Sequence, residues 1–157
     1  MIKFKKFNEL TNHELYEIMR LRQEVFVLEQ TCLYPDLDNL DQDCIHVISY
    51  AKSDPPAADG SAAAPIVAYL RILPAGAVFD TVAIGRVLVR EDLRKDGLAR
   101  ELLVETLNYI KNVLGEKHVK LSAQQYLIDF YESLGCHIIS EGYLEDGIPH
   151  IDMEIKF

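Results

Sequence analysis

One stretch of the sequence constrains the fold most, because three different patterns follow one another in it. Residues 81–89, TVAIGRVLV, are apolar and rich in β-branched side chains, as a buried strand is. From Gly97 to Gly115, apolar residues recur at helical spacing and face a polar side of glutamates, asparagines and a lysine. The sequence therefore predicts a strand, a charged turn and a helix with Gly115 as its C-cap. Gly85 inside the strand predicts a bulge or a close backbone approach.

The rest of the chain continues this mixture of patterns. Thr11, with Glu14 three residues later, predicts a capping box at the start of a helix. Further strands are predicted at 2–7, 44–51, 66–73, 118–123, 136–140 and 150–157, and further helices at 11–30 and 124–135. The order β-α-β-β-β-α-β-α-β-β is typical of one α/β domain over residues 1–157. The Pro- and Ala-rich segment 52–65 is predicted to be a mobile loop inserted in a hairpin.

Composition and charge exclude several classes of protein. The net charge of -9 argues against nucleic acid as the main partner, because phosphate binding requires a basic face. The three cysteines show no C-x-x-C spacing, so neither a disulfide framework nor a metal site is predicted, and a reducing, cytoplasmic location is expected. The N-terminus lacks a signal-peptide pattern, and no apolar run approaches the roughly 20 residues of a membrane span.

An aspartate-rich segment at 34–43, YPDLDNLDQD, invites comparison with a calcium-binding loop. That comparison fails, because Leu40 occupies a ligand position and the glycine expected next is absent. We expect a solvated acidic loop, or a surface that receives a cationic amine.

The turn between the strand at 81–89 and the following helix predicts an anion site. The first amides of a helix lack intrahelical partners, and the helix dipole makes that end positive. Gly97 lets the backbone approach a ligand closely, and Arg94, Lys95 and Arg100 add positive charge. A pyrophosphate fits this turn best, although neither a P-loop nor a G-x-G-x-x-G motif is present.

The turn also carries a family resemblance. The pattern R-x-x-G-x-A, from Arg94 to Ala99, resembles the acetyl-CoA signature [Q/R]-x-x-G-x-[G/A] of the GNAT family of N-acetyltransferases, and FYESLGC at 130–136 resembles the family's FYEKLGF. The segments at 21–41 and 141–151, LRQEVFVLEQTCLYPDLDNLD and EGYLEDGIPHI, resemble its ElaA-type branch. The resemblance covers nearly the whole chain apart from the predicted loop.

The resemblance implies a fold and an activity. The fold is a mixed, mostly antiparallel central sheet flanked by helices, with a splay between the fourth and fifth strands. The activity is transfer of an acetyl group from acetyl-CoA to a primary amine of a small molecule or peptide by direct attack, without a metal. A homodimer is compatible with it. The alternative is a CoA-binding regulatory or interaction protein without turnover, which Asp96 in the signature and an uncertain catalytic base would favour.

The resemblance also implies a set of cofactor-binding residues. The strand before the signature would pair with the pantetheine arm, and one of its N–H groups would stabilise the oxyanion. The amides and cationic side chains of the signature would hold the pyrophosphate. The residues in question are Val87, Leu88, Val89, Arg94, Lys95, Asp96, Gly97, Leu98, Ala99, Arg100 and Gln124. Asp96 departs from the family's basic or neutral preference.

Catalytic roles follow from the same resemblance. Tyr131 would be the general acid, because a phenol with a pKa near ~10 is protonated at pH 7 and can donate to the leaving thiolate. Glu29, His46 and His150 are candidates for the general base, whereas Gln124 could only orient the substrate. Ordinary structural roles stay open for each of them, and for His46, in an apolar strand, a core histidine is slightly favoured.

Overall fold

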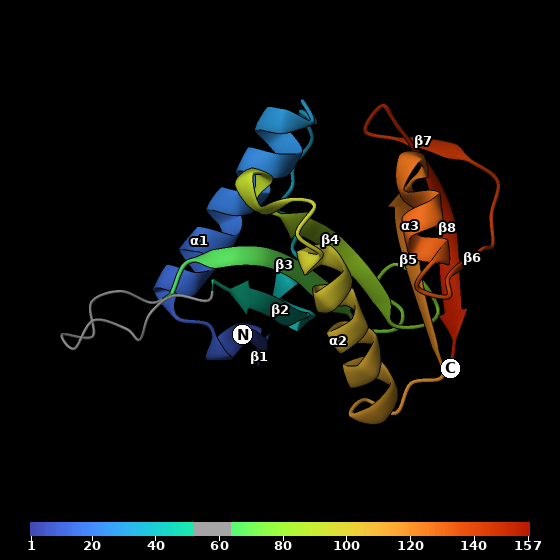
Figure 1. Ribbon diagram of the computed structural model, residues 1–157, viewed down its shortest axis with the longest axis horizontal. Coiled ribbons are helices and arrows are strands. Elements are labelled where there is room, and N and C mark those ends of the chain that lie inside the picture. The colour runs from blue at the N-terminus through green and yellow to red at the C-terminus, as the bar shows by residue number, and fades with distance from the viewer. Residues whose placement is uncertain (52–63) are drawn as a thin grey trace.

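The computed structural model describes residues 1–51 and 64–157 (Figure 1). Most of the predicted inserted loop, residues 52–63, lies outside the described residues. The strands are β1 (Ile2–Lys6), β2 (Ile45–Tyr50), β3 (Ile66–Leu73), β4 (Ala83–Val89), β5 (His118–Gln124), β6 (His137–Ile138), β7 (Tyr143–Glu145) and β8 (Ile148–Lys156). The helices are α1 (Asn12–Arg22), a π-helix (Gln23–Glu29), α2 (Leu98–Asn112) and α3 (Ile128–Glu132), with short 3-10 turns at Phe7–Glu9, Asp41–Asp43, Glu91–Leu93 and Gln125–Leu127.

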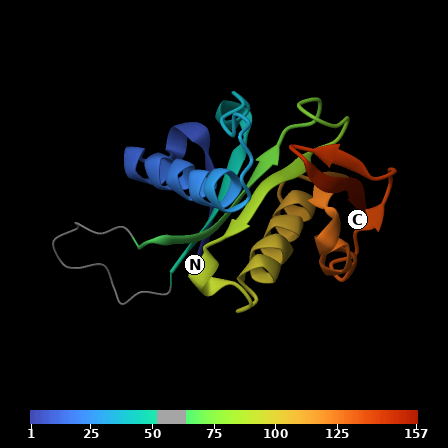
Figure 2. The same ribbon diagram turned by 90° about the horizontal axis from the view of Figure 1, so that it is seen from above.

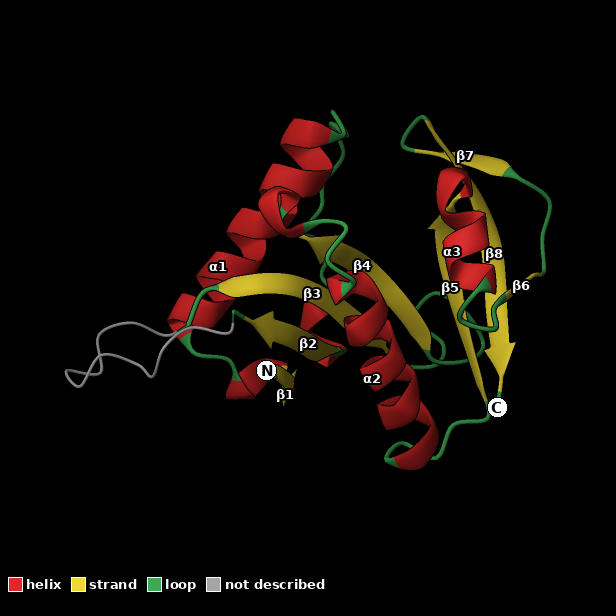
Figure 3. Cartoon of the chain, viewed as in Figure 1, coloured by secondary structure: helices red, strands yellow, loops and turns green. Residues whose placement is uncertain are grey.

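The strands form one sheet in the order β1-β2-β3-β4-β5-β8-β6, with β7 also paired to β8. Neighbouring strands are antiparallel except β4 and β5, which are parallel. The parallel ladder contains only the pairs Ala83–Lys120 and Ile84–Leu121, after which the two strands diverge (Figure 3). The predicted splay between the fourth and fifth strands is therefore confirmed.

Helices cover both faces of the sheet, as Figure 2 shows for α1 and α2. On one face, Ile18 and Leu21 of α1 pack with Ile48 and Tyr69 of the sheet. On the other face lies the larger core, in which α2 and α3 pack on the inner strands; its buried helical members include Leu102, Leu103, Ile110 and Tyr131. The predicted mixed α/β class with flanking helices is confirmed.

The first predicted helix differs from the observed one in its second half. Thr11 and Glu14 form the predicted capping box, so the start of α1 is confirmed. Beyond Arg22 the coil widens into the π-helix, where the N–H of Gln30 donates to the carbonyl of Val25 at 3.2 Å. The apolar spacing of the sequence does not distinguish this wider coil from an α-helix, because the segment has only seven residues.

The C-terminal segment contains a hairpin that the strand pattern missed. Strand β7 pairs with the start of β8 around Asp146 and Gly147, which have φ angles of 51° and 75°. An Asp-Gly pair with both residues in the left-handed region is the preferred two-residue turn of a β-hairpin. The Asp-Gly dipeptide was the sequence signal for this hairpin. Because β7 pairs with residues before His150, β8 begins at Ile148 rather than at His150.

Candidate active site

Strand β4 carries a bulge where it leaves β5. Tyr69 pairs with Leu88 and Arg71 pairs with Gly85, so Arg86 and Val87 together stand opposite a single residue of β3. Arg86 has a φ angle of 56°, and a Cβ atom on Gly85 would lie 3.2 Å from a methyl group of Leu73. The predicted bulge is confirmed; such a bulge bends the strand and redirects its backbone.

A cavity of about 340 Å³ occupies the splay beside this bulge. Its wall is assembled from five parts of the chain, namely the π-helix and the segment after it, the β3–β4 hairpin, the bulge, the β5–α3 segment and the β7–β8 hairpin. Four residues predicted for the site line it, which are Val87, Gln124, Tyr131 and His150. The fold therefore brings together residues that lie more than sixty positions apart in the sequence.

Tyr131 reaches the cavity from α3 with a side chain that is only 5% exposed. Its ring packs edge to face on Phe130, with the centroids 5.3 Å apart. Burial raises the pKa of the Tyr131 hydroxyl, so the phenol stays protonated. No hydrogen-bond partner of this hydroxyl occurs within residues 1–51 and 64–157, which leaves the proton available for donation into the cavity.

His150 lies on β8 opposite Gln124 of β5. Its Nδ1 lies 2.7 Å from the carbonyl oxygen of Ile148, and because a carbonyl only accepts, this nitrogen carries the proton in the neutral ring. The lone pair then resides on Nε2, which lies 3.5 Å from the Glu145 carboxylate. Gln124 itself donates to the side-chain oxygen of Gln30 at 3.0 Å, which connects β5 to the chain after the π-helix.

The other two candidate bases lie away from the cavity. His46 is 1% exposed within the sheet, where its ring nitrogens lie 2.8 Å from the Tyr69 hydroxyl and 3.0 Å from the Asp41 carbonyl oxygen. Burial lowers the pKa of His46 and keeps the ring neutral. Glu29 ends the π-helix and accepts a hydrogen bond of 2.7 Å from Arg94. Among the described residues, neither of the two lines the cavity.

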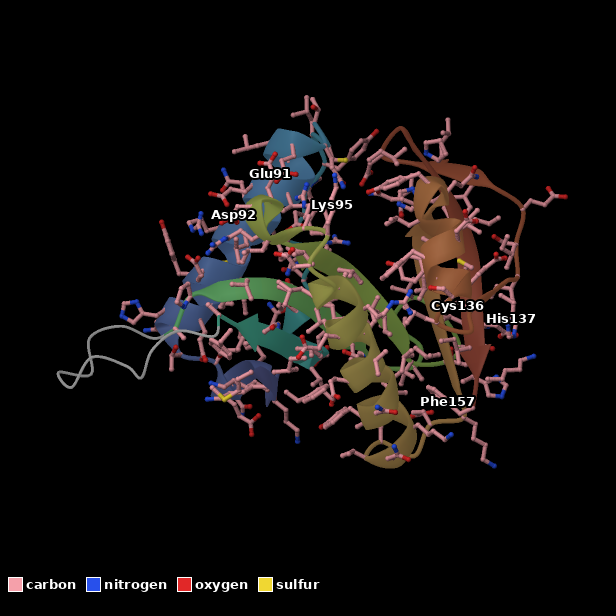
Figure 4. The ribbon with its side chains drawn as sticks, viewed as in Figure 1. Glu91, Asp92, Lys95, Cys136, His137 and Phe157 are labelled. Atoms are coloured by element: carbon pink, nitrogen blue, oxygen red, sulfur yellow. The ribbon has the colours of Figure 1, made fainter. Side chains whose placement is uncertain are left out.

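The signature turn joins β4 to α2, as Figure 4 shows by the positions of Glu91, Asp92 and Lys95. Lys95 and Gly97 have φ angles of 75° and 79°, and Gly97 is the N-cap of α2. Within the part of the chain that the structure describes, the N–H groups from 95 to 100 meet no acceptor. The side chain of Asp96 is exposed. This turn therefore presents a run of backbone N–H groups without acceptors in the described structure, next to the splay.

Two arginines of the signature contact neighbouring elements. Arg94 donates to the Val89 carbonyl at 3.1 Å as well as to Glu29. Arg100 donates to the Ser133 hydroxyl at 2.6 Å and stacks on the Phe130 ring. Arg100 thus connects the start of α2 to the end of α3, and Arg94 connects the signature turn to the π-helix.

The expectation of a solvated acidic loop at 34–43 is wrong, because three aspartates of this segment pair with buried arginines. Arg22, 1% exposed, donates to Asp36 and to Asp41 at 2.7 Å each. Arg71, 2% exposed, donates to Asp41 at 2.7 Å and to Asp38 at 2.8 Å. A buried arginine requires carboxylate partners, so two arginines within apolar patterns were the signal that these aspartates fold inward.

Arg86 of the bulge completes this cluster. It donates to Asp36 at 2.7 Å through Nε and lies 3.4 Å from Asp38. Three arginines and three aspartates are then matched in charge, and we call them the arginine–aspartate cluster: Arg22, Arg71, Arg86, Asp36, Asp38 and Asp41. The cluster ties the chain after the π-helix to β3 and to the bulge.

Over residues 1–51 and 64–157, no three side chains of histidine, cysteine, aspartate or glutamate gather as a metal site requires. In the same ranges, every helix is too short or too polar to span a bilayer.

Comparisons with known proteins agree with this geometry. The model of the acetyltransferase (GNAT) domain family matches residues 61–157. A UPF0039 protein of Schizosaccharomyces pombe is 40% identical over 154 residues, which are 98% of this chain and 95% of that protein. Protein ElaA of Escherichia coli is 38% identical over 148 residues, covering 93% of this chain and 90% of its own length.

Solved structures give the same result. The crystal structure of Escherichia coli ElaA matches with a TM-score of 0.84 and 36% identity, covering 99% of this chain and 100% of that one. An acyl-CoA N-acyltransferase from Pseudomonas aeruginosa matches with a TM-score of 0.84 and 36% identity, covering 99% of both chains. The splayed sheet, the signature turn and these relatives lead to one conclusion: the chain belongs to the GNAT superfamily of acetyltransferases, in its ElaA-like branch.

Proposed function

We propose that this protein is an acetyl-CoA-dependent N-acetyltransferase that acts on a primary amine. One observation carries the proposal: a single cavity in the splay is lined by the bulge of β4 on one side and by Tyr131 and His150 on the other. The open donors of the signature turn stand at the end of the same strand. This arrangement offers a cofactor site, a proton donor and a proton acceptor around one space.

The cofactor would enter from the α2 side. The ladder between β4 and β5 ends at Ile84, so the edge of β4 from Val87 to Val89 has no neighbouring strand there and its backbone groups can pair with the amides of pantetheine. The donors from 95 to 100, with Arg94 and Arg100, would hold the pyrophosphate at the N-terminus of α2. Gln124, at the end of β5, would face the acyl end.

The proposed transfer proceeds by direct attack. The amine nitrogen bonds to the carbonyl carbon of the thioester, a backbone N–H of β4 stabilises the oxyanion, and Nε2 of His150 takes the proton that the nitrogen loses. The carbon–sulfur bond then breaks, and the thiolate receives the proton of the Tyr131 hydroxyl. Solvent returns a proton from His150 to Tyr131. We assign the base to His150 because Glu29 and His46 are held by other partners outside the cavity lining.

Binding of acetyl-CoA, measured by calorimetry, tests the cofactor site with two matched variants. Gly97→Glu places a negative side chain where the pyrophosphate should lie, and we expect it to abolish binding. Gly115→Glu has the same positive φ and equally open surroundings at the other end of α2, and we expect it to bind like the wild type. Equal binding by both variants would remove the cofactor site from the signature turn.

Release of free thiol in the presence of a panel of primary amines tests turnover. We expect amine-dependent thiol release together with formation of the acetylated amine. Tight acetyl-CoA binding without any release would instead favour the alternative, a CoA-binding regulatory or interaction protein.

A further inference from the structure

The charges around the cavity are unevenly distributed. Six charged side chains line it: Asp36, Asp38, Arg71, Arg86, Glu145 and Asp146. The first four belong to the arginine–aspartate cluster, which is balanced by Arg22 and Asp41 beneath it. The charge that the cavity presents is therefore set by the other two, Glu145 and Asp146.

These two carboxylates belong to the β7–β8 hairpin and are exposed at the cavity mouth. Within the described ranges, neither contacts a lysine or an arginine, and the one basic neighbour is His150 beside Glu145. The charge of Asp146 acts on Cys32, which also lines the cavity: burial raises the pKa of the Cys32 thiol, and Asp146 raises it further. The mouth of the cavity is thus negative on the side of the proposed base.

The arginines that line the cavity do not reverse this sign. The guanidinium of Arg71 is 2% exposed and already bonds Asp38 and Asp41. Arg86 is bonded to Asp36. A carboxylate of a ligand would therefore meet neutralised arginines on one side and two free carboxylates on the other.

Large apolar side chains stand exposed around the same mouth. Tyr34, Val78 and Tyr126 line the cavity although they are 62%, 57% and 74% exposed. They come from three separate parts of the chain, and exposed apolar groups gathered at a cavity mouth are typical of a ligand site rather than of ordinary surface.

Building on the proposed function, we propose that the acceptor is a primary amine carried by an apolar body, without a carboxylate next to the amine. The amine points to His150 and Tyr131, the body lies between Tyr34, Val78 and Tyr126, and Glu145 and Asp146 attract the ammonium form and repel a neighbouring carboxylate. Free α-amino acids are excluded by this rule.

Three acceptors separate the two parts of the rule: phenethylamine, phenylalanine and ethylamine. Phenethylamine and phenylalanine share one body and differ by a carboxylate, and phenethylamine and ethylamine share one charge and differ by the body. We expect kcat/KM for phenethylamine to exceed that for each of the other two at least about tenfold. Both ratios are taken from the same enzyme preparation.

Two variants with matched controls connect these ratios to the residues. In Glu145→Gln/Asp146→Asn, the preference over phenylalanine should fall at least about fivefold; Glu105→Gln, an exposed glutamate on α2, should leave it unchanged. In Tyr126→Ala, the preference over ethylamine should fall at least about threefold; Tyr16→Ala, 68% exposed on α1, should leave it unchanged. Because each result is a ratio of two acceptors, a general loss of rate in a variant cancels.

The outcomes separate this inference from the proposed function. Acetylation that prefers phenylalanine or ethylamine, or ratios that the cavity variants leave unchanged, would overturn the inference while the acetyltransferase proposal stands. Absence of thiol release with every amine would remove the acetyltransferase proposal itself, and this inference with it.

Discussion

Tyr131 is the residue on which the proposed chemistry depends most directly. Tyr131→Phe removes one hydroxyl and keeps the ring on Phe130, so we expect the fold and the KM for acetyl-CoA to be retained. The rate constant kcat should fall about 100-fold, because a positioned proton donor contributes a factor of that order. Steady-state thiol release measures it. Tyr16→Phe, on an exposed tyrosine of α1 far from the cavity lining, is the control, and an unchanged kcat in Tyr131→Phe would exclude Tyr131 as the acid.

Asp41 is the residue that holds the arginine–aspartate cluster together, because it bonds both buried arginines. Asp41→Asn leaves two guanidinium groups short of negative charge, and we expect it to lower the free energy of unfolding by about 3 kcal/mol. Urea unfolding followed by circular dichroism measures the change. Asp43→Asn, exposed in the same 3-10 turn, should change it little; equal losses in both variants would contradict the role of the cluster.

The sequence predicted two residues of the cavity but not the hydrogen-bond partners of the other candidate bases. The residue types at Tyr131 and His150 agreed with the family pattern, and the structure places both in the cavity. The pattern could not reveal that His46 is held between Tyr69 and Asp41, or that Glu29 pairs with Arg94 from 65 positions away. Such partners depend on which strands become neighbours, which is decided by the whole fold.

Helix α1 is anchored by one carboxylate at its first turn. Glu14 accepts hydrogen bonds from the Thr11 N–H at 2.9 Å, from Lys5 of β1 at 2.8 Å and from the Tyr50 hydroxyl of β2. Burial would raise the pKa of Glu14, but these three donors outweigh it and lower the pKa from its ordinary 4.5 to about 2. The ionised form is therefore bound more tightly in the folded protein than in the unfolded chain.

The pH dependence of stability follows from this sign. The stabilisation by Glu14 is fully present above about pH 4.5 and is lost as the pH falls toward about 2. We expect Glu14→Gln to cost about 2 kcal/mol at pH 7 and progressively less at pH 4 and pH 3. Urea unfolding at the three pH values measures it, with Glu105→Gln as the control. A loss that stays constant with pH would show that the charge of Glu14 is not the cause.

At the level of elements, most strands and helix α2 were predicted well, whereas the helix predicted at 124–135 is too long, because α3 covers only Ile128–Glu132 after a 3-10 turn. Both strands of the β3–β4 hairpin and helix α2 lie within one or two residues of their predicted positions, apart from the last turn of α2. Their apolar patterns extend over seven residues or more. Strand β7 has three residues and is defined by the Asp-Gly turn beside it, and the apolar residues of the π-helix continue those of α1 without a break. Local turn chemistry, rather than periodicity, determines such elements.

The molecule as a whole has an open splay that the cofactor would bridge. A ligand that binds only the folded form, at about 100 times its Kd, raises the free energy of unfolding by about 2.7 kcal/mol, which corresponds to about 5–10 °C in Tm for a chain of this size. We expect CoA to produce this shift in a thermal melt. ADP, which lacks the pantetheine arm, should produce much less at equal concentration. Equal shifts would show that nothing binds between β4 and β5.

The two residue pairs between β4 and β5 have a consequence beyond the cavity. Strands β1 to β4 come from residues 1–89 and strands β5 to β8 from residues 118–156, so each half of the sheet is a continuous piece of the chain. The first piece leads directly into the signature turn and α2, and the second supplies Tyr131 and His150. The reaction would thus take place at an internal interface between two consecutive modules. A change at Ala83, Ile84, Lys120 or Leu121 would alter how the modules are aligned, and hence the rate, without replacing any group that reacts.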